Sequence, residues 1–395
     1  MVTFDNTQVA FAVNSNADLR RARLLFSSIS WPLMVKVGEF LLKIATSLHI
    51  PISWAIKPTI FRQFVGGETL PECAAAVNKL SQSGVKSILD YSVEGKNTEE
   101  ERENAMLEIH ESILHASQNP DIPFAVFKPS GIADTMVLEK VSCKQELTSD
   151  EQKKYDSFIR RVETLCEAAS NSQTSILIDA EDSWYQAAID NVVEQMMQRY
   201  NRTEPIVFNT LQMYRTDRMN YLIMAHKRAI ESGYLIGMKL VRGAYMEKER
   251  HRADEQGYIS PIHETKADTD RDFNEAVKYC IANIDTISLF CGTHNEDSVA
   301  YATMLMERNQ VKPTDKRIFF SQLFGMSDNI SFNLAASEYN VAKYIPYGPV
   351  NEVLPYLIRR AQENTSVKGQ TGRELSLIRK ELKRRKSLRK TEQKK

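Results

Sequence analysis

The chain has 395 residues, which suffices for one large domain or for two of ordinary size. Its 51 basic and 51 acidic residues cancel, so the net charge gives no argument for a nucleic-acid or membrane partner. The five cysteines are scattered and odd in number, which predicts a reducing compartment and argues against a disulfide framework or a cysteine metal site.

Residues 1–57 are predicted to form an N-terminal helical arm. Residues 16–18 are expected to open a basic helix over 19–29. Apolar residues at helical spacing over 33–48 predict a second helix that packs on its own domain, with contact to a membrane surface or a partner as the alternative. The first thirty residues lack a continuous apolar segment, so we expect no signal peptide. Charged residues interrupt the 33–50 segment, which therefore does not fit a membrane-spanning helix.

Residues 58–365 alternate short β-branched runs with longer segments of helical period. We expect Thr59–Val65, which also has strand character, to be helical because Pro58 precedes it. The predicted strands are Lys86–Val93, Pro123–Lys128, Ser175–Ala180, Ile206–Leu211, Ile236–Val241, Ile287–Cys291, Arg317–Ser321 and Ala342–Ile345. The predicted helices between them are 97–118, 150–171, 184–200, 216–233, 267–284, 295–309 and 328–337.

Eight strands separated by helices form parallel βα units, and this number predicts a (β/α)8 barrel. A doubly wound open sheet is the alternative. No G-x-G triplet occurs in the chain, so neither the dinucleotide fingerprint of open sheets nor a P-loop is present. This absence favours the barrel. No spacing of histidines, cysteines and acids fits a metal site either.

The C-terminal tail, residues 366–395, is basic and poor in apolar residues. From residue 379 onward it holds ten Lys or Arg and two Asp or Glu. The composition predicts a solvated or disordered helix, and attraction to an anionic membrane surface is the second reading.

Polar side chains end at least six of the eight predicted strands, where barrel enzymes place their chemistry. Each has an ordinary explanation alone, such as a solvent-facing lysine or a helix cap. Their convergence on one end of a barrel predicts an enzyme. The strand-end residues are Lys128, Asp179, Glu181, Asp182, Asn209, Gln212, Tyr214, Lys239, Arg242, Tyr245, Thr293 and His294, with Leu323 and Tyr344 at the last two strands.

The helix predicted after the last strand has two unlike faces. Val353, Leu354, Leu357, Ile358 and Ala361 form an apolar back. The front carries side chains at i, i+3, i+4 and i+7, with two adjacent guanidiniums suited to clamp a carboxylate or phosphate. A solvated face with an internal ion pair is the alternative. The front residues are Tyr356, Arg359, Arg360 and Glu363.

Two kinds of chemistry fit this set of residues. A Schiff-base lyase would use Lys128 or Lys239 as its nucleophile. A redox enzyme would instead hold a cofactor across the strand ends. A non-catalytic barrel that binds nucleic acid through its basic tail is a third reading, but it leaves the strand-end residues unexplained.

Four motifs stand out along the chain: Lys239-Leu-Val-Arg-Gly-Ala-Tyr245, Ile178-Asp-Ala-Glu181, Thr293-His-Asn295 and Tyr356-Leu-Ile-Arg-Arg360. They resemble those of proline dehydrogenases, and the resemblance spans about residues 60–365. It implies a distorted (β/α)8 barrel with its last helix over an FAD. The implied reaction is oxidation of L-proline to Δ1-pyrroline-5-carboxylate, the first step of proline catabolism to glutamate, with electrons passed to a membrane quinone. The chain shows no aldehyde dehydrogenase module, so it resembles the monofunctional kind.

Residue roles follow from the resemblance by motif position. Arg359 and Arg360 are expected to bind the proline carboxylate, and Glu363 to meet the amine or to orient an arginine. Asp179 is expected beneath the flavin and substrate edge, and Glu68 is expected to close over the site by pairing with Arg359. Residues expected to line the substrate pocket are Lys128, Tyr245, Leu323, Tyr344 and Tyr356. Residues expected to contact FAD are Gln212, Lys239, Val241, Gly243, Lys266, Thr293 and His294.

Two positions bear on the details of the implied reaction. Better-known bacterial relatives carry arginine where this chain has Lys239, and lysine resembles the mitochondrial branch, so flavin geometry at this point is left open. Relatives that prefer hydroxyproline tend to carry a residue smaller than Tyr344, which favours proline, with hydroxyproline as the alternative substrate. The resemblance and the absent presequence predict a cytoplasmic enzyme with peripheral contact at the inner face of a bacterial membrane, and no nucleic-acid partner.

Overall fold

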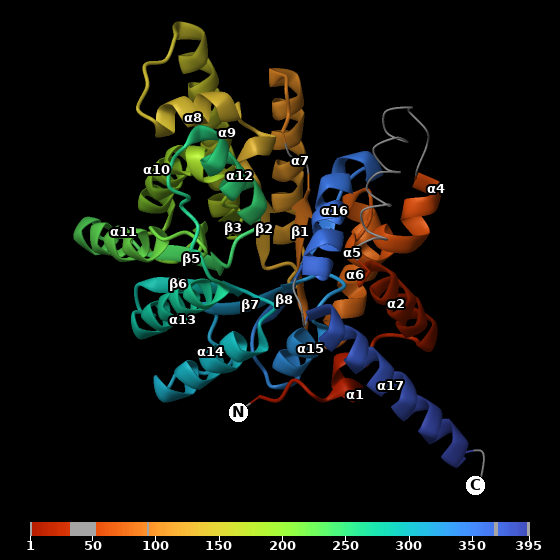
Figure 1. The fold of residues 1–395 in the computed structure, drawn as a ribbon. Coiled ribbons are helices and arrows are strands. Elements are labelled where there is room, and N and C mark those ends of the chain that lie inside the picture. Colours follow the sequence, from red (N-terminus) through yellow and green to blue (C-terminus); the bar gives the residue numbers. More distant parts are fainter. Residues whose placement is uncertain (1, 32–52, 93–94, 367–369, 393–395) are drawn as a thin grey trace.

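The structure is a computed structural model that describes residues 2–31, 53–92, 95–366 and 370–392. Eight parallel strands close into a barrel in the order β1 to β8, and β8 pairs with β1 over six residues from Lys86 to Tyr91. Helices surround the barrel (Figure 1). The (β/α)8 prediction is therefore confirmed, and the open-sheet alternative is wrong because the sheet has no free edge.

All eight strands lie where the sequence predicted them. The bounds of β5 agree at both ends, while β7 and β8 run two residues further than predicted. Buried parallel strands are apolar on both faces, and this makes them easy to recognise in the sequence. The strands are β1 Lys86–Tyr91, β2 Phe124–Phe127, β3 Ser175–Ile178, β4 Val207–Gln212, β5 Ile236–Val241, β6 Ile287–Gly292, β7 Ile318–Leu323 and β8 Val341–Tyr347.

The seven helices predicted between the strands are all present, and the Thr59–Val65 segment is helical as far as Phe64, with a kink at Thr59. The helices of the barrel region are α7 Glu99–Ser117, α8 Thr135–Ser142, α9 Ser149–Asn171, α10 Ser183–Tyr200, α11 Arg218–Ser232, α12 Met246–Gln256, α13 Lys266–Ala282, α14 Glu296–Arg308, α15 Asp328–Ala336 and α16 Val350–Ser366, with a short 3-10 turn η2 at Pro129–Gly131. The flanking elements are α1 Thr7–Ala10, α2 Asn16–Ile29, α4 Ser53–Ile56, the π-helical turn η1 Lys57–Phe61, α5 Arg62–Phe64, α6 Leu70–Ser81 and α17 Gln370–Glu392.

Aromatic rings fill the lower interior of the barrel. The ring of Phe124 meets the rings of Phe208, Phe290 and Phe319 edge to face, with centroids 4.9 to 5.6 Å apart. Gly237 on β5 makes room for this layer, because a Cβ there would lie 2.5 Å from the Phe208 ring. Aromatic rings thus pack this layer of the interior, and the polar strand-end side chains lie above it, at the carboxyl ends of the strands.

A second apolar core joins both ends of the chain to α16 (Figure 1). It contains Phe26 of α2, Phe64 of α5, Val353 and Leu357 of α16, and Ile378 of α17. The tail was expected to be a solvated or disordered helix. It is a helix, but the expectation that it is solvated is wrong, because Leu377 and Ile378 are buried in this core. The arm and the tail therefore seat α16 on the barrel through its apolar back.

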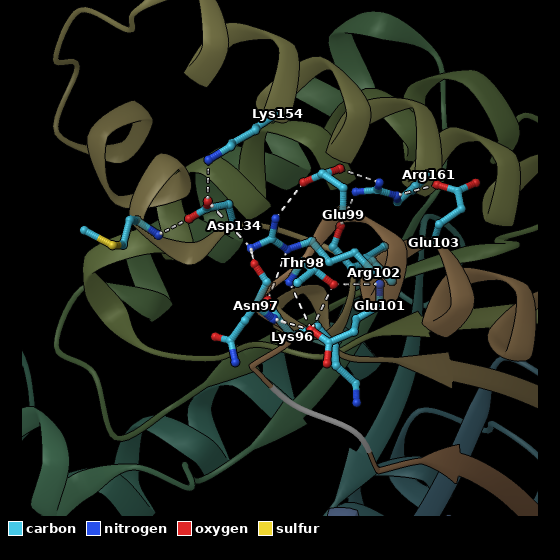
Figure 2. A network of polar contacts seen from close by, with 12 residues as sticks. Lys96, Asn97, Thr98, Glu99, Glu101, Arg102, Glu103, Asp134, Lys154 and Arg161 are labelled. Carbon is cyan, nitrogen blue, oxygen red and sulfur yellow. Dashed lines mark hydrogen bonds and ion pairs between the residues drawn. The ribbon is translucent and has the colours of Figure 1, made fainter.

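Buried arginines fasten the segment after β2 to the outer helices (Figure 2). Arg161 of α9 binds Glu99 at 2.6 Å and Glu103 at 2.9 Å, and also donates to the carbonyl oxygen of Ile132 at 3.0 Å. Arg102 binds the same Glu99 at 2.6 Å. This network fixes the loop that follows Lys128, one of the strand-end residues.

No helix among the described residues is both long and apolar enough to cross a bilayer. The apolar stripe predicted over residues 33–48 lies outside the described residues.

Candidate active site

Asp179 is the centre of a buried polar cluster at the carboxyl ends of the strands. Its Oδ1 accepts a hydrogen bond from Lys239 Nζ of β5 at 2.5 Å, and its Oδ2 accepts one from the Tyr344 phenol of β8 at 2.7 Å. Lys128 Nζ, just after β2, lies 3.4 Å from the same Oδ2. Strands distant in sequence thus place two ammonium groups and a phenol on one carboxylate, as the strand-end pattern predicted.

Charge keeps this carboxylate ionised. Burial alone would raise the pKa of Asp179, but the ammonium groups of Lys239 and Lys128 outweigh burial and hold that pKa below its ordinary value. Burial, reinforced by the charges of Asp179 and Asp90, raises the pKa of Tyr344 well above its ordinary value. Tyr344 is therefore a neutral phenol that donates to Asp179 across the physiological pH range.

Asp90 on β1 completes the cluster and was missed in the sequence. It is 1% exposed and its Oδ2 lies 2.7 Å from Lys128 Nζ. Two lysines and two aspartates therefore balance at the top of the barrel, which makes their burial tolerable. The signal that could have found it is a single acid within the apolar run Ser87-Ile-Leu-Asp90, two residues after the inward-facing Ile88.

Lys239 and Tyr344 also stack. The ammonium of Lys239 lies 4.7 Å from the centre of the Tyr344 ring and 6.0 Å from that of Phe290. Leu323, at the end of β7, pairs in register with Tyr344 and packs against the same interior cluster. The cluster therefore has a cationic side and an apolar wall.

Helix α16 brings its polar front across the strand ends. The guanidinium of Arg359 lies 5.8 Å from the Tyr245 ring, which follows β5 on the far side of the barrel from β8. Arg360 is buried and lies 5.2 Å from the Tyr356 ring. The sequence thus correctly predicted a helix over the strand ends, although α17 and not α16 is the last helix. Glu363 lies on α16, but its side chain is outside what the structure describes.

A second polar group surrounds Arg242, directly after β5. Its guanidinium donates to Asp270 at 2.7 Å, to Thr293 Oγ1 at 2.6 Å and to Ser298 Oγ at 2.9 Å. Lys266 reaches the same Asp270 carboxylate at 2.5 Å from a largely exposed position. Arg242 was noted at its strand end in the sequence, but no role was assigned to it there.

The ends of β4 and β5 are held together by Gln212. Its Nε2 donates to the Glu181 carbonyl at 2.7 Å, and its Oε1 accepts the Ala244 N–H at 2.9 Å. Val241 ends β5, and its carbonyl accepts the N–H of Met213 at 2.8 Å. Gly243 is required in this turn, since its φ is 144° and a Cβ would lie 2.4 Å from the Tyr214 ring.

His294 is a neutral imidazole in one tautomer. The Leu323 N–H points to Nε2 at 3.3 Å, so Nε2 is the acceptor and Nδ1 donates to Ser327 Oγ at 2.9 Å. Burial, together with the charges of Lys343, Arg360 and Arg242, lowers the pKa of His294 to about 3. The charge of Arg360 on α16 thus acts on a residue after β6.

Glu68 lies at the rim beside the start of α16. Its carboxylate binds Lys57 and accepts the Val350 N–H at 3.2 Å. The predicted pairing of Glu68 with Arg359 stays a prediction.

Comparison with known proteins decides the family. A sequence profile described as proline dehydrogenase matches residues 73–373. The chain belongs to the proline dehydrogenase family. The resemblance seen in the sequence is thereby confirmed, since the matched segment contains Asp179, Lys239, Tyr344 and both arginines of α16.

Relatives within the family carry more than one substrate name. The chain is 34% identical over 382 residues to the mitochondrial proline dehydrogenase 1 of Dictyostelium discoideum, covering 86% of this chain and 67% of that protein. It is 31% identical over 415 residues to the hydroxyproline dehydrogenase of Xenopus laevis, covering 95% of this chain and 88% of that protein.

A solved structure supports the fold of this proline dehydrogenase family member. Proline utilization A from Bdellovibrio bacteriovorus, inactivated by N-propargylglycine, superimposes with a TM-score of 0.72 at 18% identity. The match covers 83% of this chain and 36% of that one, so the chain spans about a third of the larger protein. At this identity the comparison shows the shared barrel alone.

The donor chemistry at the strand ends fits the flavin dinucleotide that the family implies. Arg242 and Lys266 share the single carboxylate of Asp270, so these three groups together carry one net positive charge. A diphosphate suits such a site. Lys239 adds a buried cation deeper in the barrel, where an electron-rich ring would be stabilised.

Proposed function

We propose that the chain oxidises L-proline to Δ1-pyrroline-5-carboxylate with FAD as its cofactor. The observation that carries this proposal is the buried cluster of Asp179, Lys239, Tyr344 and Lys128 beneath the paired arginines of α16. The arginines are the proposed cationic lid and Leu323 part of the proposed apolar wall of a site for a small anionic substrate.

The two arginines of the lid are proposed to hold the substrate carboxylate. Arg360 is buried and Arg359 is half-buried. Because both guanidiniums are partly shielded from water, their attraction to an anion is stronger than it would be in bulk solvent. Fixing the carboxylate orients the ring against Tyr344, Tyr356, Tyr245 and Leu323. Glu363 is proposed to meet the substrate amine or to orient an arginine.

The Asp179 cluster is proposed to shape the floor of the pocket. Because Asp179 is already satisfied by Lys239 and Tyr344, it holds both side chains in place rather than taking a proton itself. Lys128 is fixed in the same way by Asp90. The floor is therefore rigid before substrate enters, which reduces the entropy lost on binding.

FAD is proposed to be held by polar residues at the strand ends, namely Arg242, Lys266, Gln212, Thr293 and His294. Val241 and Gly243 are proposed to contact it through the β5–α12 turn. When bound, FAD supplies the acceptor for the hydride that leaves the ring carbon beside the proline nitrogen. Lys239 is proposed to stabilise the negative charge that arises near it. An ammonium is a point charge, so it achieves this without the planar geometry of an arginine.

Hydroxyproline is the second candidate substrate, because a hydroxyproline dehydrogenase is among the relatives. The phenol of Tyr344 already donates to Asp179 and lies 3.4 Å from Lys128 Nζ, and its bulky ring fills the wall where an added hydroxyl would need room. We therefore favour proline. Steady-state oxidation of both substrates with an artificial electron acceptor tests this choice: kcat/KM should be higher for L-proline. A preference for hydroxyproline would overturn the assignment.

Electrons are proposed to pass to a membrane quinone, with the protein at the inner face of a bacterial membrane. Two features support this proposal: the exposed Trp31 and Trp54 within the arm, and the exposed basic residues along α17. Tryptophans and basic helices are common at the surface of anionic membranes. This acceptor and this location predict the vesicle binding described in the Discussion.

A further inference from the structure

Helix α17 reaches the strand ends through its first buried residues. The family profile ends at residue 373, so Glu374 is the first position beyond it. Glu374 is 5% exposed, and its Oε1 accepts the backbone N–H of Ser327. Its neighbour Arg373 binds Glu296 at the start of α14 at 2.9 Å. The start of α17 is thus docked on the loops after β6 and β7.

Ser327 occupies a costly conformation for a residue with a side chain. Its φ and ψ are 51° and 41°, in the left-handed region that favours glycine, at a cost of about 1 kcal/mol. The serine hydroxyl is nevertheless useful there, because Ser327 Oγ is the acceptor for His294 Nδ1 at 2.9 Å. A glycine would relieve the strain and lose this contact.

The whole turn from Leu323 to Ser327 is held from three sides. Lys343 of β8 is fully buried, binds Asp328 at 2.9 Å and donates to the Met326 carbonyl. Gln63 of α5 donates to the Gly325 carbonyl at 2.8 Å. Glu374 holds the remaining side. The N–H of Leu323 in turn meets His294 Nε2, so the turn contacts both ring nitrogens of this histidine.

We propose that Glu374 is a positioning residue: it holds the Leu323–Ser327 turn so that Ser327 fixes the tautomer of His294 and Leu323 keeps its place in the pocket wall. The inference rests on the proposed function only in assigning His294 to the cofactor. It makes α17 part of the catalytic unit, although most of this helix, from Glu374 onward, lies beyond the family profile.

Four variants test the proposal. Glu374→Ala removes the acceptor of the Ser327 N–H, and Ser327→Gly removes the hydroxyl while easing the backbone. Glu374→Gln keeps an oxygen acceptor; burial and Asp328 raise the pKa of Glu374 to about 7, so a neutral side chain is a close substitute. Glu381→Ala is the matched control, since Glu381 is equally buried on α17 but binds Thr7, Arg384 and Arg385.

The readout is the tautomer of His294 in the holoenzyme, measured from ¹⁵N shifts of labelled histidine, together with the rate of FAD release. Glu374→Ala and Ser327→Gly should shift the tautomer ratio toward Nε2–H by about fivefold, the effect of losing one ordinary hydrogen bond. Both should speed FAD release. Glu374→Gln should restore wild-type values, and Glu381→Ala should lower Tm while leaving both readouts unchanged.

An unchanged tautomer in Ser327→Gly and Glu374→Ala would overturn the proposal, as would an equal response in Glu381→Ala. If Glu374→Ala fails to fold, Glu374→Met takes its place, because it fills the buried space without an acceptor for the Ser327 N–H. Failure of the proposed function is seen separately: a protein without flavin or proline oxidation refutes that function, while the tautomer is measured without turnover.

Discussion

The phenol of Tyr344 donates a 2.7 Å hydrogen bond to the carboxylate of Asp179, which joins the last strand of the barrel to the third. Removing only this hydroxyl in Tyr344→Phe should lower kcat/KM for proline about tenfold, as expected for a hydrogen bond to a charged group. Steady-state kinetics measure this.

Tyr347→Phe is the matched control for that variant. Tyr347 is buried on the same strand, but its hydroxyl meets Glu108 at 3.2 Å on the outer side of the barrel. Its kcat/KM should stay at the wild-type value. Equal losses in the two variants would mean that a general packing effect, and not the contact with Asp179, accounts for the result.

Asp179 should also contribute to stability in a way that depends on pH. Because its folded-state pKa is lowered, its contribution is fully present above the ordinary aspartate pKa and is lost as pH falls through the lower folded value. Asp179→Asn leaves the buried Lys239 without its carboxylate, while Lys128 keeps Asp90, and should cost about 3–5 kcal/mol near neutral pH.

Denaturant unfolding of wild type and Asp179→Asn from pH 7 down to pH 2 measures this linkage. The difference in the free energy of unfolding should shrink only below about pH 4, the ordinary aspartate range. A difference that grows on acidification would refute the stated charge of Asp179.

The arginine clamp predicts a defect in binding. Arg359→Met and Arg360→Met should each raise KM for proline by at least about tenfold, because a charge-assisted contact to the carboxylate is lost, while FAD stays bound. Arg228→Met is the control. It removes a surface arginine of α11 that pairs with Glu194 of α10, and KM should stay unchanged. An unchanged KM in both variants would refute the proposal that these arginines bind the substrate carboxylate.

Membrane attraction predicts a charge effect on α17. Arg379, Lys383 and Lys386 are exposed on this helix, and reversing all three to glutamate should weaken binding to anionic vesicles by at least about 100-fold, at about 1 kcal/mol for each basic residue. Co-sedimentation with vesicles measures this. Reversal of Arg160, Arg199 and Lys227, exposed on α9, α10 and α11, should have little effect. Equal losses would indicate that net charge alone governs attraction.

The sequence was sufficient for the barrel because buried strands such as β2, Phe-Ala-Val-Phe, are continuous apolar runs. It was insufficient for α12, because Glu249 and Ala253 are its only buried residues and no apolar stripe marks it. By contrast, the local pattern of apolar and polar residues was sufficient to predict the two faces of α16. It did not give the burial of α17, which depends on a core shared with the arm at the opposite end of the chain.

The candidate site divides in the same way. Asp179, Lys239 and Tyr344 could be predicted because parallel strands bring their carboxyl ends together whatever the sequence between them. The contact of Glu374 with Ser327 could not, because these residues are 47 positions apart and neither belongs to a motif. Asp90 was hidden for a simpler reason: one acid in a strand usually faces solvent.

The visible spectrum of the purified protein, with and without L-proline in the absence of oxygen, tests the central claim most directly. The purified protein should be yellow, and its flavin absorption should bleach when L-proline is added. A colourless protein that borohydride traps covalently with its substrate would contradict that claim and point instead to Schiff-base chemistry at Lys128 or Lys239.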